Sequence, residues 1–219
     1  MTQEKEVSTS RTSAGLTLQQ RAHVVVNGLG AASWFWIIVM VLYQWFLVDQ
    51  GVWKGLPAGL QTCVDGVVLY SAILDTSMHY TEDLLLCVQT LIRLFVLFGI
   101  ITLFPSIQSL KIYYPCLLFV WATQHVVRYS YDAYQKLSDF PSLVHARFAW
   151  PLYLAPLGVV LEIMMMYTAL PLAKEWNRTY GLMMAFGGLA YLPGFPVLYK
   201  NVLIERRRYI QRLFLEKNK

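Results

Sequence analysis

The stretch from Phe148 to Leu172 is apolar enough to cross a lipid bilayer, and it contains one charged side chain, Glu162. A helix needs about 20 mostly apolar residues to span the hydrocarbon core. A carboxylate at the centre of such a helix costs at least about 2.5 kcal/mol on insertion scales, so these residues usually face a bundle interior or a polar cavity. The stretch therefore predicts a membrane helix packed against partners, with Glu162 as the first candidate for chemistry.

The composition of the whole chain is that of a membrane protein. Of the 219 residues, 57% are hydrophobic and 14% are charged, and the mean hydropathy is +0.45. Soluble domains are about 45–50% apolar and about 25% charged. We therefore expect one all-α integral membrane bundle without a separate soluble domain. The three cysteines lack the spacing of a metal site, and we expect neither a metal nor a cofactor.

Six apolar segments are predicted to cross the membrane. The second is interrupted by Asp65 and Asp75, and the fourth carries Arg128 near its end. The segments are residues 29–48, 62–80, 84–104, 113–134, 148–172 and 181–203. Together they form a six-span domain over residues 28–203, between a polar tail (1–27) and a basic tail (204–219).

The distribution of lysine and arginine predicts the orientation of these spans. With six spans, both tails and the second and fourth connecting segments share one side, and that side carries most of the basic residues. The other side carries Lys54, Lys111, Lys174 and Arg178. Because basic segments stay cytoplasmic, both termini are predicted to be cytosolic. We interpret the basic tail as a membrane-surface flank, and no nucleic-acid partner is expected.

The third and fourth predicted spans contain polar side chains that a simple membrane anchor does not need. Gln89 and Arg93 are four residues apart and share one helical face, as do Gln124 and Arg128, with His125 beside Gln124. Inside the bilayer each such group must find a partner or a water-filled cavity. For Arg128 and His125, the alternative is that they extend to the nearby membrane interface.

The remaining intramembrane groups suggest how these side chains are paired. We expect Arg93 to form a buried pair with Asp75 or Glu162. On the fifth span, Gly158 leaves space one turn before Glu162. Pro156 has no backbone N–H to donate, so it can kink the helix just before the carboxylate.

The segment from Cys87 to Arg93 has the Cys-x5-Arg spacing of tyrosine phosphatases. That chemistry needs an exposed loop whose backbone amides surround a phosphate. Here the intervening residues favour a helix, lack glycine and lie within a predicted span. We therefore reject phosphatase activity.

Several motifs together resemble the very-long-chain 3-hydroxyacyl-CoA dehydratase family, also called the protein-tyrosine-phosphatase-like family. The strongest is the fifth-span block of Pro156, Gly158 and Glu162 followed by Tyr-Thr-Ala-Leu-Pro at residues 167–171. Further similar segments are Arg-Tyr-Ser at 128–130, Ala-Arg-Phe at 146–148, Tyr-Leu-Pro at 191–193 and the pair Arg206 and Arg207. The resemblance covers most of the chain and is weaker from Asn27 to Arg93.

This resemblance implies a six-span, multi-pass enzyme of the endoplasmic reticulum membrane. Such a lyase removes water from a 3-hydroxyacyl-CoA to give the trans-2-enoyl-CoA, the third step of fatty-acid elongation and lipid biosynthesis. The substrate would be an acyl-CoA, and the partners would be the elongase and reductase enzymes of the same cycle.

The resemblance also implies a catalytic tyrosine–glutamate pair. One group takes the C2 proton, which the thioester makes acidic, and the other protonates the C3 hydroxyl. Glu162 matches the family glutamate, and basic residues such as Arg147 would face the CoA phosphates. Residues expected to orient the glutamate or the substrate are Asp75, Gln89, Arg93, Arg128, Arg147 and Gly158.

The chain departs from the family pattern at the tyrosine, because that position is Ala155. The nearest candidate is Tyr153, which lies nine residues from Glu162 and about 180° from its face on a regular helix. Tyr153 therefore serves as the second catalytic residue if Pro156 disrupts the helix. Tyr129 and Tyr131, on another span, are alternative sources of a phenol. His125 and Asp75 stand where the family has glutamate.

Two functions of other classes are alternatives to the dehydratase. A non-catalytic scaffold would keep the fold and contact elongase or reductase subunits. A small transporter is the weaker alternative, because the two halves of the chain show no paired broken segments.

Overall fold

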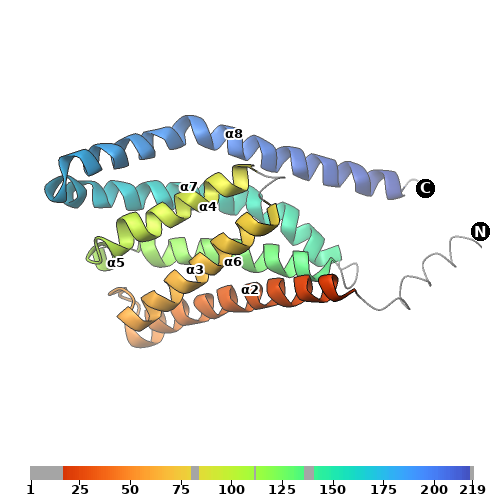
Figure 1. Cartoon of the computed structure of the whole chain (residues 1–219), viewed down its shortest axis with the longest axis horizontal. Coiled ribbons are helices and arrows are strands. Elements are labelled where there is room, and N and C mark those ends of the chain that lie inside the picture. The colour runs from red at the N-terminus through yellow and green to blue at the C-terminus, as the bar shows by residue number, and fades with distance from the viewer. Residues whose placement is uncertain (1–16, 80–83, 111, 136–140, 218–219) are drawn as a thin grey trace, which may run out of the picture.

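In the computed structural model, residues 17–79, 84–110, 112–135 and 141–217 are described, and these ranges contain helices and connecting turns but no strand. This confirms the all-α class. The elements in Figure 1 are α2 (Leu18–Tyr43), the π-helix η1 (Gln44–Val48), α3 (Ala58–His79), α4 (Leu84–Leu94), the π-helix η2 (Phe95–Thr102), α5 (Ile107–Leu110), α6 (Tyr113–Tyr134), α7 (Pro141–Trp176) and α8 (Arg178–Lys217).

Three helical stretches are long and apolar enough to cross a membrane: Leu18–Val48, Ala146–Trp176 and Arg178–Arg208. They contain the first, fifth and sixth predicted spans. The third predicted span corresponds to α4 and η2, which include the shorter apolar helix Val88–Thr102. The helices α3 and α6 cover the second and fourth, so each predicted span corresponds to helical structure, while the count of six crossings stays a prediction.

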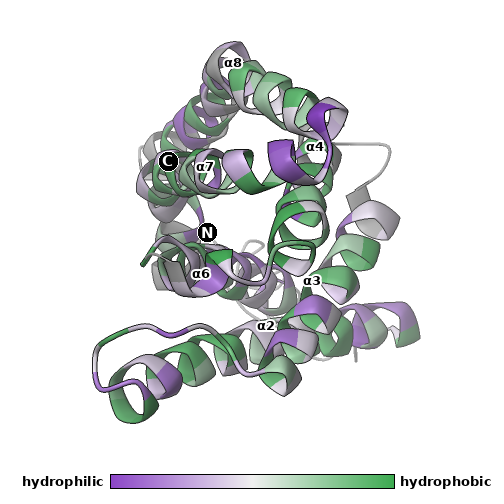
Figure 2. Cartoon of the chain, turned by 90° about the vertical axis from the view of Figure 1, so that its left-hand side faces the viewer, coloured by the Kyte–Doolittle hydropathy of each residue, from purple (hydrophilic) through white to green (hydrophobic). Residues whose placement is uncertain are grey.

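The long helices are rich in hydrophobic residues, which Figure 2 colours green along the ribbon. Large hydrophobic side chains are exposed along α2, α7 and α8, among them Phe35, Trp36, Val160, Met183 and Phe186. Apolar patches of this extent are rare on monomeric soluble proteins, and they mark contact with a membrane or a partner. The arrangement fits helices whose outer faces contact lipid.

Helix α6 is at the centre of the bundle. It packs against α2 on one side and α7 on the other, α7 also pairs with α8, and α3 contacts both α2 and α4. An end-on view shows α6 between α2 and α7 (Figure 2). Leu117, Leu118, Trp121 and Ala122 on α6 are completely buried. Polar side chains on α6 therefore reach several neighbouring helices.

Helices α7 and α8 form a hairpin joined by the single residue Asn177. The Asn177 side-chain oxygen accepts the backbone N–H groups of Thr179 at 2.8 Å and Tyr180 at 3.4 Å, which caps the start of α8. Glu162 lies fifteen residues before Asn177 and Tyr191 lies fourteen after it. At 1.5 Å per residue these two positions are almost equally far from the turn, so they lie side by side.

The start of α2 and the end of α8 lie at the same end of the bundle (Figure 1). The start of α2 is fixed by a capping box, in which the Thr17 hydroxyl accepts the Gln20 backbone N–H and the Gln20 side chain accepts the Thr17 backbone N–H. The described part of the chain therefore begins and ends on one side of the bundle.

Helices α2 and α6 approach closely at Gly30, which is buried against the ring of Tyr129. A Cβ atom added to Gly30 would lie 3.0 Å from Cδ2 of that ring. Gly28 lies two residues earlier on α2, and a Cβ atom added there would have nothing within 4 Å. Gly30 is therefore a packing residue of the interface.

We predict that Gly30→Val lowers the stability of the bundle by about 1–3 kcal/mol, the usual cost of overpacking. Gly28→Val carries the same change in helix propensity without the collision, so it serves as the matched control. Thermal unfolding of both variants in detergent measures the difference. Equal midpoints for the two variants would contradict the packing at Gly30.

Candidate active site

Glu162 on α7 is buried, and each of its carboxylate oxygens has a hydrogen-bond donor. Oε1 accepts the indole N–H of Trp121 on α6 at 2.8 Å, and Oε2 accepts the hydroxyl of Tyr191 on α8 at 2.5 Å. Its exposed fraction is 7%. The donors come from the two helices that flank α7, so the carboxylate is fixed in position and its loss of hydration is offset.

The sequence did not indicate Trp121 as a site residue, nor did it assign a role to Tyr191. Its side chain is buried, and it reaches Glu162 from α8 because the hairpin at Asn177 aligns the two positions. The signal that locates it in the sequence is this nearly equal distance from the turn. A motif comparison along α7 alone does not contain that information.

Tyr153 lies away from the carboxylate. Helix α7 continues without interruption past Pro156, so Tyr153 keeps its regular helical position on the face opposite Glu162. Its side chain is 72% exposed. The catalytic role of Tyr153 stays a prediction, and no contact in the described structure supports it.

The other two phenols that were considered are engaged elsewhere. The Tyr129 hydroxyl donates to Oδ1 of Asp75 at 2.9 Å, and the ring of Tyr131 packs edge-on against Phe148. Tyr191 is thus the phenol that the structure places on Glu162.

Arg93 on α4 binds two polar side chains of α6. Its Nη2 group donates to Oε1 of Gln124 at 2.7 Å, and its Nη1 group donates to Nε2 of His125 at 2.6 Å. Because arginine only donates, His125 accepts in its neutral form. The direct pair of Arg93 with Asp75 or Glu162 that we expected is therefore replaced by bonds to α6, since Gln124 and His125 lie closer to the guanidinium.

Arg93 still acts on the carboxylate site through space. Its guanidinium lies 5.9 Å from the centre of the Trp121 ring, within the range of a cation–π contact. It also interacts electrostatically with Glu162 and Tyr191. Arg93 therefore places a positive charge behind the Trp121 side chain that holds Glu162.

Asp75 on α3 forms a second buried polar group with α6. It makes an ion pair with Arg128 and accepts the Tyr129 hydroxyl. The Arg128 guanidinium also lies 4.9 Å from the Tyr129 ring centre. The Arg128 side chain is 11% exposed and His125 is buried. These two residues thus face the bundle, which corrects the alternative that they extend to the interface.

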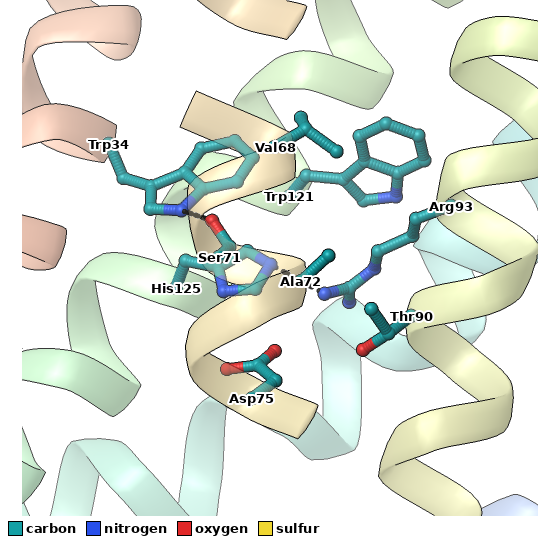
Figure 3. Close-up of a pocket in the computed structure, with 9 residues that line it drawn as sticks. All are labelled: Trp34, Val68, Ser71, Ala72, Asp75, Thr90, Arg93, Trp121 and His125. Carbon is teal, nitrogen blue, oxygen red and sulfur yellow. Dashed lines mark hydrogen bonds between the residues drawn. The ribbon is translucent and has the colours of Figure 1, made fainter. Parts of the chain in front are cut away.

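A small cavity with both polar and apolar lining lies between Asp75, Arg93 and His125 (Figure 3). Its volume is about 10 Å³, enough for about one water molecule. Trp121 lines this cavity with its ring and donates to Glu162 with its N–H, so the cavity lies directly behind the carboxylate site. The lining residues are Trp34, Val68, Ser71, Ala72, Asp75, Thr90, Arg93, Trp121 and His125.

Three further predicted site residues lie on α4 and α7. Gln89 is half-buried on α4, one turn before Arg93, and Arg147 is half-buried near the start of α7. A Cβ atom on Gly158 would lie 3.5 Å from Val120 and 3.8 Å from Gln124. A side chain there would make ordinary van der Waals contact with α6, so Gly158 lies at the interface between α6 and α7.

Sequence comparisons identify proteins to which this chain is similar. The family described as "Protein tyrosine phosphatase-like protein, PTPLA" matches residues 77–212. Very-long-chain (3R)-3-hydroxyacyl-CoA dehydratase 1 of Canis lupus familiaris is 25% identical over 198 residues, covering 80% of this chain and 77% of that protein.

Two further relatives have the same kind of name. Very-long-chain (3R)-3-hydroxyacyl-CoA dehydratase 2 of Homo sapiens is 25% identical over 206 residues, covering 85% of this chain and 80% of the relative. Very-long-chain (3R)-3-hydroxyacyl-CoA dehydratase PASTICCINO 2B of Oryza sativa subsp. japonica is 27% identical over 135 residues, covering 55% and 61%. No solved structure matches significantly. Because the family match covers more than half of the sequence, the chain belongs to the protein tyrosine phosphatase-like (PTPLA) family.

Proposed function

We propose that this protein removes water from a long-chain or very-long-chain 3-hydroxyacyl-CoA to give the trans-2-enoyl-CoA. The reaction is the third step of a fatty-acid elongation cycle. The observation that carries the proposal is the buried Glu162 carboxylate, held by donors from α6 and α8 in a chain of this family. The names of the relatives support the same reaction class.

The chemistry requires a base at C2 and an acid at C3 of the substrate. The thioester makes the C2 hydrogen acidic, and Glu162 takes that proton as the C3–O bond breaks and the C2–C3 double bond forms. The C3 hydroxyl leaves as water once it has been protonated. A carboxylate fixed by Trp121 needs little reorganisation during this transfer.

The remaining site residues support the reaction from around the cavity. Arg93, positioned by Gln124 and His125, supplies positive charge near the reacting groups. Arg147 is proposed to face the CoA phosphates, while the acyl chain lies among apolar helices. Residues proposed to orient substrate or catalytic groups, or to hold their helices in place, are Asp75, Gln89, Arg93, Arg128, Arg147 and Gly158.

The proposed setting is a multi-pass position in the endoplasmic reticulum membrane. Residues 28–203 form six crossings, and the tails at 1–27 and 204–219 are cytosolic. The excess of basic residues on the tail side supports this orientation, as do the start of α2 and the end of α8 at one end of the bundle. The elongase and reductase enzymes of the cycle are the proposed partners.

A non-catalytic scaffold for those enzymes is a second candidate function. The observation that favours it is Ala155, which stands where the family tyrosine falls. The two candidates differ in one measurable property, namely whether the purified protein turns over a 3-hydroxyacyl-CoA.

We predict that Glu162→Gln lowers kcat/KM for dehydration by about 10²–10⁴-fold, the usual contribution of a positioned acid–base group. Glu175→Gln, an exposed position on the same helix, is the matched control and keeps wild-type activity. The measurement is enoyl-CoA formation by purified protein in detergent. Wild-type protein that turns over no 3-hydroxyacyl-CoA, yet co-purifies with elongation enzymes, would contradict the enzyme and support the scaffold.

We also predict that protease added to intact microsomes removes tags from both termini. An N-glycosylation acceptor inserted between η1 and α3, in the segment that contains Lys54, becomes modified because six crossings place it in the lumen. Protection of one tag, or an unmodified acceptor in a stable variant, would require a different number of crossings or the opposite orientation.

A further inference from the structure

We infer that Tyr191 is the acid that protonates the departing C3 hydroxyl, so that the catalytic pair consists of Glu162 on α7 and Tyr191 on α8. This inference rests on the proposed dehydration and names the group that completes it. In this chain, the phenol that the family places at position 155 of α7 is supplied by the neighbouring helix.

The contact between the two side chains supports a proton-transfer role. The Tyr191 hydroxyl donates to Oε2 of Glu162 at 2.5 Å, and both side chains are 7% exposed. Such a short hydrogen bond between a hydroxyl and a carboxylate is the strong, charge-assisted kind. A proton can therefore return along this bond from Glu162 to Tyr191 after each turnover.

The proton balance of the reaction closes with these two groups. Glu162 takes the C2 proton, the electrons of that C–H bond form the C2–C3 double bond, and the C3–O bond breaks. Tyr191 gives its proton to the departing hydroxyl, which leaves as water. Glu162 then passes the C2 proton to the Tyr191 phenolate, and both groups regain their starting states. The Arg93 guanidinium, which interacts electrostatically with both side chains, stabilises the transient phenolate.

Other neighbours of Glu162 do not supply this proton. Trp121 donates through an indole N–H, which does not ionise in proteins, and Ala155 has no hydroxyl. Tyr153 lies on the opposite face of an unbroken helix, and the Tyr129 proton is bound to Asp75. Tyr191 is the ionisable hydroxyl that contacts the carboxylate in the described part of the chain.

The first test compares Tyr191→Phe with Tyr167→Phe, an exposed tyrosine of α7, on a long-chain 3-hydroxyacyl-CoA. We expect Tyr191→Phe to lower kcat/KM by about 10²–10⁴-fold, the range for a general acid, and Tyr167→Phe to leave it unchanged. Full activity of Tyr191→Phe would overturn the inference, as would a loss confined to Tyr153→Phe.

The second test uses a 3-fluoroacyl-CoA, whose fluoride leaves without receiving a proton. We expect Tyr191→Phe to regain activity on this substrate to within about tenfold of wild type, whereas Glu162→Gln stays impaired because the C2 proton must still be removed. Equal losses on both substrates would show that Tyr191 only positions Glu162, which overturns the inference. Wild-type protein without activity on either substrate would instead reject the proposed dehydration.

A variant that preserves the hydrogen bond covers the case in which Tyr191→Phe aggregates in detergent. Tyr191→3-fluorotyrosine keeps the ring and the hydroxyl but makes the phenol a stronger acid. We expect a changed rate on the 3-hydroxyacyl-CoA and an unchanged rate on the 3-fluoroacyl-CoA. Unchanged rates on both substrates would overturn the role of Tyr191 as the acid.

Discussion

The burial of one carboxylate in an apolar bundle is the constraint on which the site depends. Glu162 gives up its hydration inside α7, so each of its oxygens needs a donor from another helix. Trp121 and Tyr191 meet that need from α6 and α8. The same two bonds fix the three helices relative to one another and hold the carboxylate ready for proton transfer, so they serve both packing and chemistry.

Helix α6 extends this arrangement to the rest of the bundle. Trp121 reaches α7, the pair Gln124 and His125 reaches Arg93 on α4, and Arg128 reaches Asp75 on α3. Their spacing places them near one side of a single helix. The positive charge of Arg93 is thereby held near Glu162 without a direct ion pair between them. A direct ion pair would hold Glu162 in its charged form and oppose proton uptake.

The sequence predicts those features that depend on local composition and spacing. The apolar runs predicted the all-α bundle, and the isolated charge within Phe148–Leu172 predicted that Glu162 is buried. The pairing of side chains on different helices was harder to predict from the sequence, because it depends on how each helix is rotated about its axis. The predicted partners of Arg93 were therefore wrong. Tyr191 was missed because its place beside Glu162 depends on the turn at Asn177 rather than on a motif within α7.

The most direct measurement of the central claim, that Glu162 handles the C2 proton, is the reverse reaction in deuterated water. Purified protein would hydrate a long-chain trans-2-enoyl-CoA in D₂O, and mass spectrometry with NMR would locate the label. The account predicts one deuterium on a single face of C2 with wild-type protein and almost none with Glu162→Gln. Equal labelling by both proteins, or no hydration by wild type, would contradict it.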